Sequence, residues 1–487
     1  MTTIEDLRQE RLKKLDILRA ANMPAYAHDS WQDTEVKDFL ENFEELEKSQ
    51  KEVALVGRIM SKRGHGALAF LDIYDGTGRV QVVIKKDELD EESFSLFEKV
   101  VDKGDFLDFR GVAFTTQRGA KSLLAKEWRM LTKSLLPLPD EWVGIKDEET
   151  RLRQRYLDIL LNEEVRDMFV KRAKFWQTMR DFLLERDFLE VETPVIETTP
   201  GGAEARPFIT HHNALDAEVY LRISAGELWQ KRLMVAGLPR VFEIGRIFRN
   251  EGMSAEHAQD YTQMEFYMAY KDYNYGMQMI KDLYLKIADE VFGTRKFSIR
   301  GMEVDFDKEW EKISFVETIK EKFGIDPLST TEEEVHAKLK EENIDFNPKE
   351  TGVGRGVDLL WKKIRKSIAG PAFLIDVPTY MEPLAKKKRD NDKVVERFQV
   401  LIAGSEMGKG FSELNDPLDQ RERFMQQQAL RDAGDEEAQM ADLDYVEALE
   451  YGMPPTFGFG VSERLFSFLM NKNIREAQIF PLMKSKS

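Results

Sequence analysis

Acidic and aromatic side chains alternate with apolar ones in residues 240–270, a spacing typical of two paired strands. In the second strand Glu265 and Tyr267 share one face with Tyr261, while apolar residues occupy the other face. Arg249 lies near the end of the first strand, and a planar guanidinium can bind an oxyanion with two hydrogen bonds. Polar alternation usually marks a solvated sheet face. The mixture of carboxylate, phenols and guanidinium equally suits a site for a charged ligand.

Two features near Arg249 favour the ligand site. Gly245 stands in the middle of a strand, where it weakens the strand and indicates that another group approaches the backbone closely. The loop 250–260 is long for a hairpin connection and contains Glu251 and His257. Loops on a rigid scaffold often carry binding residues. We therefore expect a ligand close to this hairpin.

Two glycine-rich segments near the C-terminus also combine flexibility with charge. The run 458–464 ends in Arg464, which could pair with a phosphate, and its glycines would let the backbone approach a ligand. The run 404–416 places Glu406 and Glu413 beside glycines. Such carboxylates could hold Mg²⁺ against a nucleotide, or bind an amine. Alone, each run is a weak signal, because tight turns and surface acids share this composition.

The composition excludes several other kinds of chemistry. The 487 residues include no cysteine, which rules out disulfides, thiolate zinc sites and cysteine nucleophiles. The formal net charge is −17, yet residues 51–135 carry 15 basic and 13 acidic residues, a local balance that permits RNA binding. No apolar run is long enough to span a membrane. We expect a soluble, cytoplasmic protein with no membrane and no DNA partner.

Hydrophobic periodicity predicts the elements that position these residues. A period of two dominates the early part of the chain, with five short strands and a helix at about 88–102 before the fourth, as in a five-stranded oligonucleotide-binding barrel. Later, hairpin-linked strands group around helices, with a mostly helical excursion at about 310–370, which favours α+β with an antiparallel sheet over a doubly wound fold. The expected segments are a helical extension (1–50), the barrel (51–136), a linker (137–165) and a catalytic domain with its sheet flanked by helices (166–487).

Taken together, three short motifs resemble the signatures of class II aminoacyl-tRNA synthetases. They are FLEVETP (188–194), FRNEG (248–252) and the glycine-rich run ending in Glu463–Arg464. Longer phrases are similar to the lysyl branch of that family, namely PGGAEARPFITHHNALD (200–216), RVFEIGRIFRNEG (240–252) and GFSELNDPLDQRERF (410–424). The resemblance extends over essentially the whole chain, and it implies a class II catalytic domain behind an anticodon-binding barrel.

The resemblance also implies roles for individual residues. Those expected to bind ATP are Arg249, Glu251, His257, Tyr261, Glu406 and Arg464, of which Arg249 and Arg464 are also catalytic. Those expected to bind lysine are Gly202, Glu227, Glu265, Tyr267 and Glu413. Glu406 and Glu413 are expected to hold Mg²⁺. Phe70, Gln81 and Glu127 are expected to bind the anticodon, although Phe70 taken by itself would be assigned to the barrel core.

The implied activity is that of a lysine–tRNA ligase, which forms lysyl-adenylate from lysine and ATP and transfers the lysine to the 3′ end of tRNA(Lys). Fixed guanidinium groups would stabilise charge on the phosphate during attack by the lysine carboxylate. That carboxylate is already ionised, so the reaction needs no general base. ATP and Mg²⁺ are the implied cofactors, and the first motif implies a homodimer.

The sequence departs from the family pattern at a few positions. Gln399 stands where a glutamate usually joins Glu406, Lys409 and Gly245 stand where asparagines are usual, and the glycine-rich motif is one residue short. The alternatives are a ligase that attaches lysine to a translation factor, a non-catalytic RNA-binding relative, and a synthetase for aspartate or asparagine. The barrel argues against the ligase for a translation factor, and Arg249 and Arg464 argue against the non-catalytic relative. The acidic pocket argues against the synthetase for aspartate or asparagine.

Overall fold

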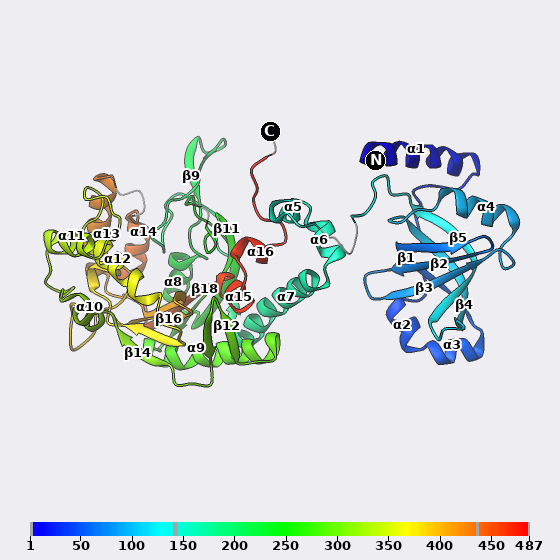
Figure 1. The fold of residues 1–487 in the computed structure, drawn as a ribbon. Coiled ribbons are helices and arrows are strands. Elements are labelled where there is room, and N and C mark those ends of the chain that lie inside the picture. Colours follow the sequence, from blue (N-terminus) through cyan, green and yellow to red (C-terminus); the bar gives the residue numbers. More distant parts are fainter. Residues whose placement is uncertain (1–2, 140–144, 253, 435–437, 486–487) are drawn as a thin grey trace. The chain divides into compact units, whose positions relative to one another are not determined.

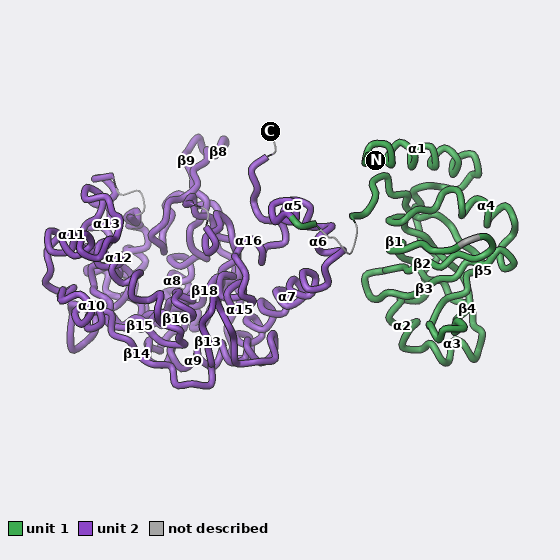
Figure 2. Tube along the Cα trace, viewed as in Figure 1, with its two compact units in different colours: residues 1–146 green, residues 147–487 purple. Residues whose placement is uncertain are grey.

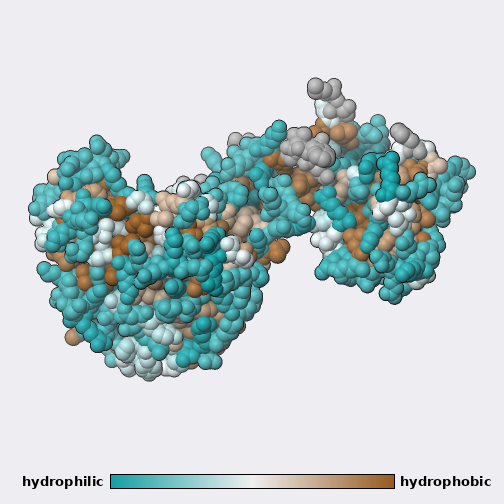
Figure 3. Space-filling model, turned by 60° about the horizontal axis from the view of Figure 1, so that its bottom comes forward, coloured by the Kyte–Doolittle hydropathy of each residue, from teal (hydrophilic) through white to brown (hydrophobic). Residues whose placement is uncertain are grey.

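The computed structural model describes residues 3–139, 145–252, 254–434 and 438–485. The chain divides into two compact units, Met1–Lys146 and Asp147–Ser487 (Figure 2). Hydrophilic residues dominate the visible face of each unit in Figure 3, as expected for a chain in which 33% of the residues are charged. No helix in the described ranges combines the length and apolarity that crossing a membrane requires.

The first unit is a closed five-stranded barrel with added helices (Figure 1). Its strands are hydrogen-bonded in the order β1-β2-β3-β5-β4, and α4 (Glu91–Val100) separates β3 from β4 as predicted. Alternate residues point inward, so that Leu71 and Ile73 of β2 are completely buried. The strands are β1 (Glu52–His65), β2 (Leu68–Tyr74), β3 (Arg79–Lys85), β4 (Phe106–Thr115) and β5 (Lys121–Thr132).

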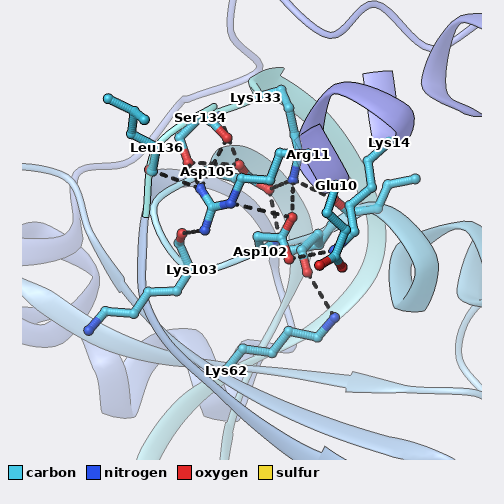
Figure 4. Close-up of polar contacts among 12 residues, drawn as sticks. Glu10, Arg11, Lys14, Lys62, Asp102, Lys103, Asp105, Lys133, Ser134 and Leu136 are labelled. Atoms are coloured by element: carbon cyan, nitrogen blue, oxygen red, sulfur yellow. Dashed lines mark hydrogen bonds and ion pairs between the residues drawn. The ribbon is translucent and has the colours of Figure 1, made fainter. Parts of the chain in front are cut away.

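Helix α1 (Ile4–Ala20) is held to the barrel by a mostly buried ionic cluster (Figure 4). The Arg11 guanidinium donates hydrogen bonds to three backbone carbonyl groups of the unit. The Lys14 ammonium lies 2.7 Å from Asp102, and Asp102 lies 2.5 Å from the ammonium of Lys133, a side chain with no exposed surface. The apolar face of α1, together with α2 (Val36–Glu41) and α3 (Phe43–Ser49), joins the barrel core.

The second unit is built on an eight-stranded sheet with the order β14-β15-β16-β17-β18-β11-β10-β6. Its five central pairings are antiparallel, and only the two edge pairings are parallel, which confirms the predicted α+β class. The strands are β14 (Glu311–Ser314), β15 (Ala372–Ile375), β16 (Arg397–Ile402), β17 (Ser405–Ser412), β18 (Thr456–Ser462), β11 (Asp260–Ala269), β10 (Arg240–Phe248) and β6 (Leu189–Glu190). Two small sheets, β7-β9-β8 and β12-β13, accompany it. Their strands are β7 (Ile196–Glu197), β8 (Ile209–His212), β9 (Ala217–Leu221), β12 (Lys296–Ile299) and β13 (Met302–Asp305).

Helices bury the two faces of the large sheet in two hydrophobic clusters. One cluster joins α7 (Glu163–Leu184) and α9 (Tyr273–Ile287) to apolar residues such as Phe266 and Phe459. The other joins α8 (Glu227–Val235), α10 (Phe315–Phe323), α11 (Glu332–Glu341), α12 (Val353–Arg365) and α14 (Leu443–Glu450) to the opposite face. The remaining helical segments are α5 (Glu148–Arg153), α6 (Arg155–Leu161), a π-helical turn (Ala288–Phe292), a 3₁₀ turn (Thr379–Met381), α13 (Pro417–Asp432), α15 (Arg464–Leu469) and α16 (Ile474–Ala477).

Two segments differ from the sequence-based expectation. The predicted strand FLEVETPVI contributes only β6 and β7, because between them the backbone N–H of Thr193 donates to the Glu243 carboxylate at 3.0 Å instead of to a strand. The expected linker 137–165 contains α5 and α6, which belong to the second unit.

Candidate active site

Adjacent strands of the large sheet bring most of the predicted ligand-binding residues together. Strands β17, β18, β11 and β10 lie side by side, and β18 separates the polar residues of β17 from those of β11. On β18, Gly458 pairs with Tyr267 on one side and with Phe411 on the other. A Cβ atom on Gly458 would lie 2.1 Å from Oε1 of Glu413 and 2.6 Å from Cε1 of Tyr267. The glycine-rich strand therefore makes room for a carboxylate and a phenol.

Glu265 lies buried on β11 and is only 3% exposed. Its Oε1 accepts hydrogen bonds from the backbone N–H of Ala225 at 2.8 Å and from Nε2 of Gln263 at 2.5 Å. Its Oε2 accepts from the Tyr267 hydroxyl at 3.2 Å. Burial raises the pKa of Glu265, and the negative charge of Glu227 raises it further against these hydrogen bonds. A cation bound here would oppose both effects.

Glu227, Gly202 and Glu413 complete an acidic pocket around Glu265. Glu227 begins α8, and a Cβ atom on Gly202 would lie 2.6 Å from its Cβ, so the two residues are in close contact. Glu413 is 1% exposed, and burial raises its pKa although the Lys231 ammonium favours the charged form. Oε1 of Glu413 has no hydrogen-bond partner in the part of the chain that the structure describes. A buried carboxylate oxygen without a partner suits an ammonium ligand.

Lys231 is a pocket residue that the sequence analysis missed. Its ammonium lies 2.7 Å from Oε1 of Glu227 and 2.5 Å from Oε2 of Glu413, and its side chain is 1% exposed. A lysine four residues after a glutamate on a helix is typical of an exposed ion pair. The sequence around Lys231 indicated only a helix, and that prediction did not show that the helix face carrying Lys231 is buried.

Arg249 and Tyr261 lie at the neighbouring end of the hairpin. The Arg249 Nε donates to the carbonyl oxygen of Ile223 at 3.2 Å, and its guanidinium carbon is 5.8 Å from the Tyr261 ring centroid. Ala225, two residues after Ile223, donates its backbone N–H to Glu265. One short segment therefore contacts both the arginine that could hold an anion and the carboxylate that could hold a cation.

Arg464 and Glu406 form a second charged group. Arg464 begins α15, and its Nη2 donates to the backbone carbonyl of Glu406 at 2.5 Å. Glu256, which the sequence analysis did not single out, lies 3.7 Å from Arg464. Burial favours the neutral acid, but the positive charges of Arg464 and Arg300 hold the pKa of Glu256 below its usual value. Glu256 therefore neutralises Arg464 in this state of the molecule.

The residues predicted in the hairpin loop also have defined surroundings. Glu251 is half-buried, and its backbone carbonyl accepts a hydrogen bond from Nε2 of Gln259 at 3.2 Å. His257 is exposed, and its Nδ1 lies 2.7 Å from the Ser254 hydroxyl. The loop thus presents an acid and an imidazole beside the two arginines.

Glu406 and Glu413 do not form a common magnesium site. Glu406 is the second residue of β17, and Glu413 directly follows the last residue of that strand. Oε1 of Glu406 accepts from Nε1 of Trp361 at 3.0 Å, whereas Glu413 contacts Lys231. No cluster of three or more metal-binding side chains occurs among the described residues. Glu406, whose Oε1 also lies 3.8 Å from Nε of Arg365, could hold a Mg²⁺ ion only together with nucleotide phosphates, as one carboxylate often does.

Gly245 is closely approached, as predicted, but the approaching group belongs to the protein. A Cβ atom there would lie 2.1 Å from Nη2 of Arg222. Arg222 forms a buried ion pair with Glu243, whose Oε2 also accepts from the Thr193 hydroxyl at 2.6 Å. These residues position the strand and do not contribute to the acidic pocket.

Lys409 points to Glu382, an acid outside the pocket, rather than to the pocket carboxylates. Its ammonium lies 3.0 Å from Oε2 of Glu382, and Oε1 of the same residue pairs with Nη1 of Arg397 at 2.7 Å. Arg397 in turn donates a hydrogen bond to the side-chain oxygen of Gln399. Lys409 and Gln399, two residues at which the sequence departs from the family pattern, therefore belong to one polar network.

The residues predicted to bind RNA lie on the outside of the barrel. Phe70 is half-buried and points away from the core, so the alternative assignment to the core is wrong. Gln81 on the neighbouring strand accepts a hydrogen bond from the Ser122 hydroxyl at 3.1 Å. Glu127 is exposed on β5 and lies 3.3 Å from Arg110. The structure brings Phe70 and Gln81 onto adjacent strands, with Glu127 farther along the surface.

Comparison with known proteins identifies relatives of both units. Residues 147–484 match the family model of class II tRNA synthetases (D, K and N), and residues 53–131 match the OB-fold nucleic acid binding domain. The lysine–tRNA ligase of Thermotoga maritima is 40% identical over 489 residues, which are 99% of this chain and 97% of the relative. That of Halalkalibacterium halodurans is 44% identical over 492 residues, which are 99% and 98% of the two chains.

Proposed function

This chain belongs to the lysine–tRNA ligases among the class II tRNA synthetases, and we propose that its buried acidic pocket is where lysine is selected. The protein is an ATP-dependent ligase whose substrates are lysine, ATP and tRNA. The observation that carries the proposal is the convergence of Glu265, Glu227 and Glu413, three buried carboxylates. Lysine differs from most amino acids by a second ammonium, which would compensate the negative charge that remains beside Lys231 in this pocket.

We assign the side-chain ammonium of lysine to Glu265, Tyr267 and Glu413. The free Oε1 of Glu413 and the phenol of Tyr267 lie on either side of Gly458, where the missing side chain leaves space. The α-ammonium is assigned to Glu227, beside Gly202. A neutral side chain in this pocket would leave Glu265 and Oε1 of Glu413 without a cationic partner, and unpaired buried polar groups are a strong basis for rejecting a wrong substrate.

The adenylation step follows from the positions of the two arginines. A lysine whose ammonium groups occupy the acidic pocket directs its carboxylate toward Arg249 across the segment 223–225. The carboxylate oxygen attacks the α-phosphorus of ATP, a new oxygen–phosphorus bond forms, and pyrophosphate leaves. Arg249 neutralises the α-phosphate during this step. The nucleotide replaces Glu256 as the partner of Arg464. Tyr261 offers a ring for stacking against adenine, and the loop residues Glu251 and His257 contact the nucleotide.

Glu406 would hold Mg²⁺ together with the phosphates of ATP. The ion would supply positive charge to the leaving pyrophosphate. In the second step the terminal ribose hydroxyl of tRNA attacks the lysyl carbonyl and an ester forms. The bond from the carbonyl carbon to the phosphate oxygen breaks, and AMP leaves with the hydroxyl proton on its phosphate. We place this activity in the cytoplasm and assign no membrane or DNA partner to it.

The barrel would bind the anticodon through Phe70, Gln81 and Glu127. A half-exposed aromatic ring next to an amide and a carboxylate suits unpaired bases, which stack on rings and hydrogen-bond through their edges. The match of residues 53–131 to a nucleic acid binding fold supports this assignment.

Phe70→Ala is expected to impair the charging of tRNA without changing lysyl-adenylate formation. The ring lies in the other unit from the acidic pocket, and loss of one base–aromatic stack costs roughly 1–3 kcal/mol of RNA binding. Aminoacylation and lysine-dependent pyrophosphate exchange, measured side by side, test this. Tyr26→Ala is a matched control, since Tyr26 is an exposed aromatic of the same unit outside the predicted surface. Equal losses in both assays would show that Phe70 is structural.

We further propose that the protein is a homodimer. Large apolar side chains are exposed in and next to the FLEVETP motif, namely Leu189, Val195 and Ile196, and Val170 is exposed on the preceding helix α7. Exposed apolar groups that follow one segment are typical of an interaction surface. Sedimentation equilibrium would give the mass of two chains if this surface pairs with that of a second copy.

The experiment that tests the pocket assignment is pyrophosphate exchange with each of the twenty amino acids. Exchange that depends on lysine is the expected result. Exchange with aspartate or asparagine would favour the specificity of the sister synthetases. The acidic pocket argues against that specificity, because its carboxylates would repel the aspartate side chain and would have no cationic partner in the asparagine side chain. Adenylation of lysine without transfer to tRNA would instead favour a ligase that modifies a protein.

Lys409→Asn is expected to leave the KM for lysine within about threefold of wild type. The Lys409 ammonium is bound to Glu382 and does not neutralise the pocket carboxylates. Steady-state pyrophosphate exchange at varied lysine checks this. A large gain in lysine affinity would show that Lys409 competes with the substrate, and the pocket assignment would then have to be withdrawn.

A further inference from the structure

The buried ammonium of Lys231 has no role in the reaction described above. It lies between Glu227 and Glu413, at 2.7 and 2.5 Å, inside the pocket proposed for lysine. We infer that Lys231 is a built-in counter-ion that positions these two carboxylates and matches the charge of the pocket to that of lysine. The inference rests on the proposed lysine pocket and makes Lys231 a positioning residue for specificity.

The geometry shows how Lys231 would position the acids. Its ammonium donates a hydrogen bond to Oε1 of Glu227 and lies 2.5 Å from Oε2 of Glu413 as an ion pair, and these contacts restrain both carboxylates. The second oxygen of Glu413 has no hydrogen-bond partner in the described ranges and lies beside the space above Gly458. The Lys231 ammonium is also 5.3 Å from the ring centroid of Phe411, so its environment is closed by an aromatic face.

The charges of the pocket are complementary to lysine only when Lys231 is counted. Glu227, Glu265 and Glu413 would contribute three negative charges, and Lys231 reduces the sum to two. Lysine contributes two ammonium groups to this pocket, while its carboxylate goes to Arg249. The loaded pocket is then neutral, which matters because an uncompensated buried charge is strongly unfavourable. Without Lys231, three carboxylates would face two ammonium groups.

The groups around Glu413 support a charged Lys231. Glu227 and Lys231 approach it from α8, Glu265 and Tyr267 lie on β11, and Tyr445 lies on α14. Burial lowers the pKa of Lys231, but the charges of Glu227 and Glu413 outweigh that effect, and its pKa is raised. Lys231 therefore keeps its proton throughout the neutral range.

The test compares variants that separate charge from hydrogen bonding at residue 231. Lys231→Gln keeps N–H donors for both carboxylates but removes the charge, and Lys231→Arg keeps the charge. Lys231→Met, a neutral side chain of similar length, is prepared in parallel in case the glutamine variant does not fold. Each full-length variant is checked by thermal melting and then assayed by pyrophosphate exchange at varied lysine and varied ATP.

We expect Lys231→Gln to raise the KM for lysine at least tenfold, with kcat within about threefold and the KM for ATP unchanged. For Lys231→Arg, the KM for lysine, kcat and the KM for ATP should all stay within about threefold of the wild-type values. The ratio of the variant to the wild-type KM for lysine should also grow from about pH 6.5 to pH 8.5, because the variant must bind a proton to balance the loaded pocket.

An unchanged KM for lysine in a folded neutral variant would overturn the inference. Parallel losses in kcat and in both KM values would also overturn it, since they indicate a structural role. The same holds if neither neutral variant folds while Lys231→Arg does. Wild-type protein that fails to exchange pyrophosphate with lysine would instead refute the proposed pocket, so the two failures are distinguishable.

Discussion

Arg249→Ala is expected to reduce lysine-dependent adenylation by about 10²–10³-fold while leaving the fold intact, because it removes a fixed donor to charge that develops on the α-phosphate. In the structure this side chain is partly exposed at the end of β10, and its described hydrogen bond is to the carbonyl of Ile223. Its loss should therefore affect stability little. Pyrophosphate exchange together with thermal melting measures the two properties separately.

Arg246→Ala provides a matched control for Arg249. Arg246 lies three residues earlier on the same strand, is exposed, and pairs with Asp260 away from the acidic pocket. Exposed ion pairs of this kind contribute little to stability. Comparable losses in the two variants would show that the strand tolerates no truncation, and the catalytic assignment of Arg249 would lose its basis.

Glu265→Gln is expected to raise the KM for lysine by at least about 100-fold, with a smaller change in the KM for ATP. The substitution keeps the shape of the side chain but removes a buried negative charge, and leaving a buried cation without its partner costs about 3–5 kcal/mol. The amide would also place an N–H group against the N–H of Ala225 or the hydroxyl of Tyr267, which now donate to the carboxylate. Exchange kinetics at varied lysine measure the effect.

Glu218→Gln is the control for the change from acid to amide. Glu218 lies on β9 and is exposed, and its carboxylate accepts a hydrogen bond from Tyr220 at 2.6 Å. Its KM for lysine should equal that of wild type. If Glu265→Gln behaves in the same way, the ammonium of lysine binds elsewhere, and the specificity of the pocket must be explained by other residues.

Period-two alternation was sufficient to predict the two hairpin strands and the common face of Glu265 and Tyr267. It could not assign that face to a ligand, since a solvated sheet has the same pattern. The resemblance to a known family supplied Glu227 and Glu413. The pairing of β11, β18 and β17 brings Glu413 near Glu265, and the packing of α8 brings Glu227 to them. The pairing order of distant strands is a property of the fold and leaves no local signal.

The errors have physical causes as well. Gly245 correctly indicated a close approach, but the sequence does not reveal that the approaching group is Arg222 of the same chain. Glu406 and Glu413 were grouped because they share a glycine-rich segment, whereas an extended strand carries them apart. Lys231 and Glu256 escaped notice because single charged residues on a helix or in a loop are usually exposed.

The ionic cluster under helix α1 limits how this protein can be recombined with others. Arg11 and Lys14 complete a set of buried charges whose remaining members, among them Asp102 and Lys133, come from the barrel. A barrel transferred to another protein without α1 would expose a hydrophobic face and leave Asp102 with fewer cations around it. The module that can be exchanged between proteins during evolution or by engineering is therefore the helix and the barrel together.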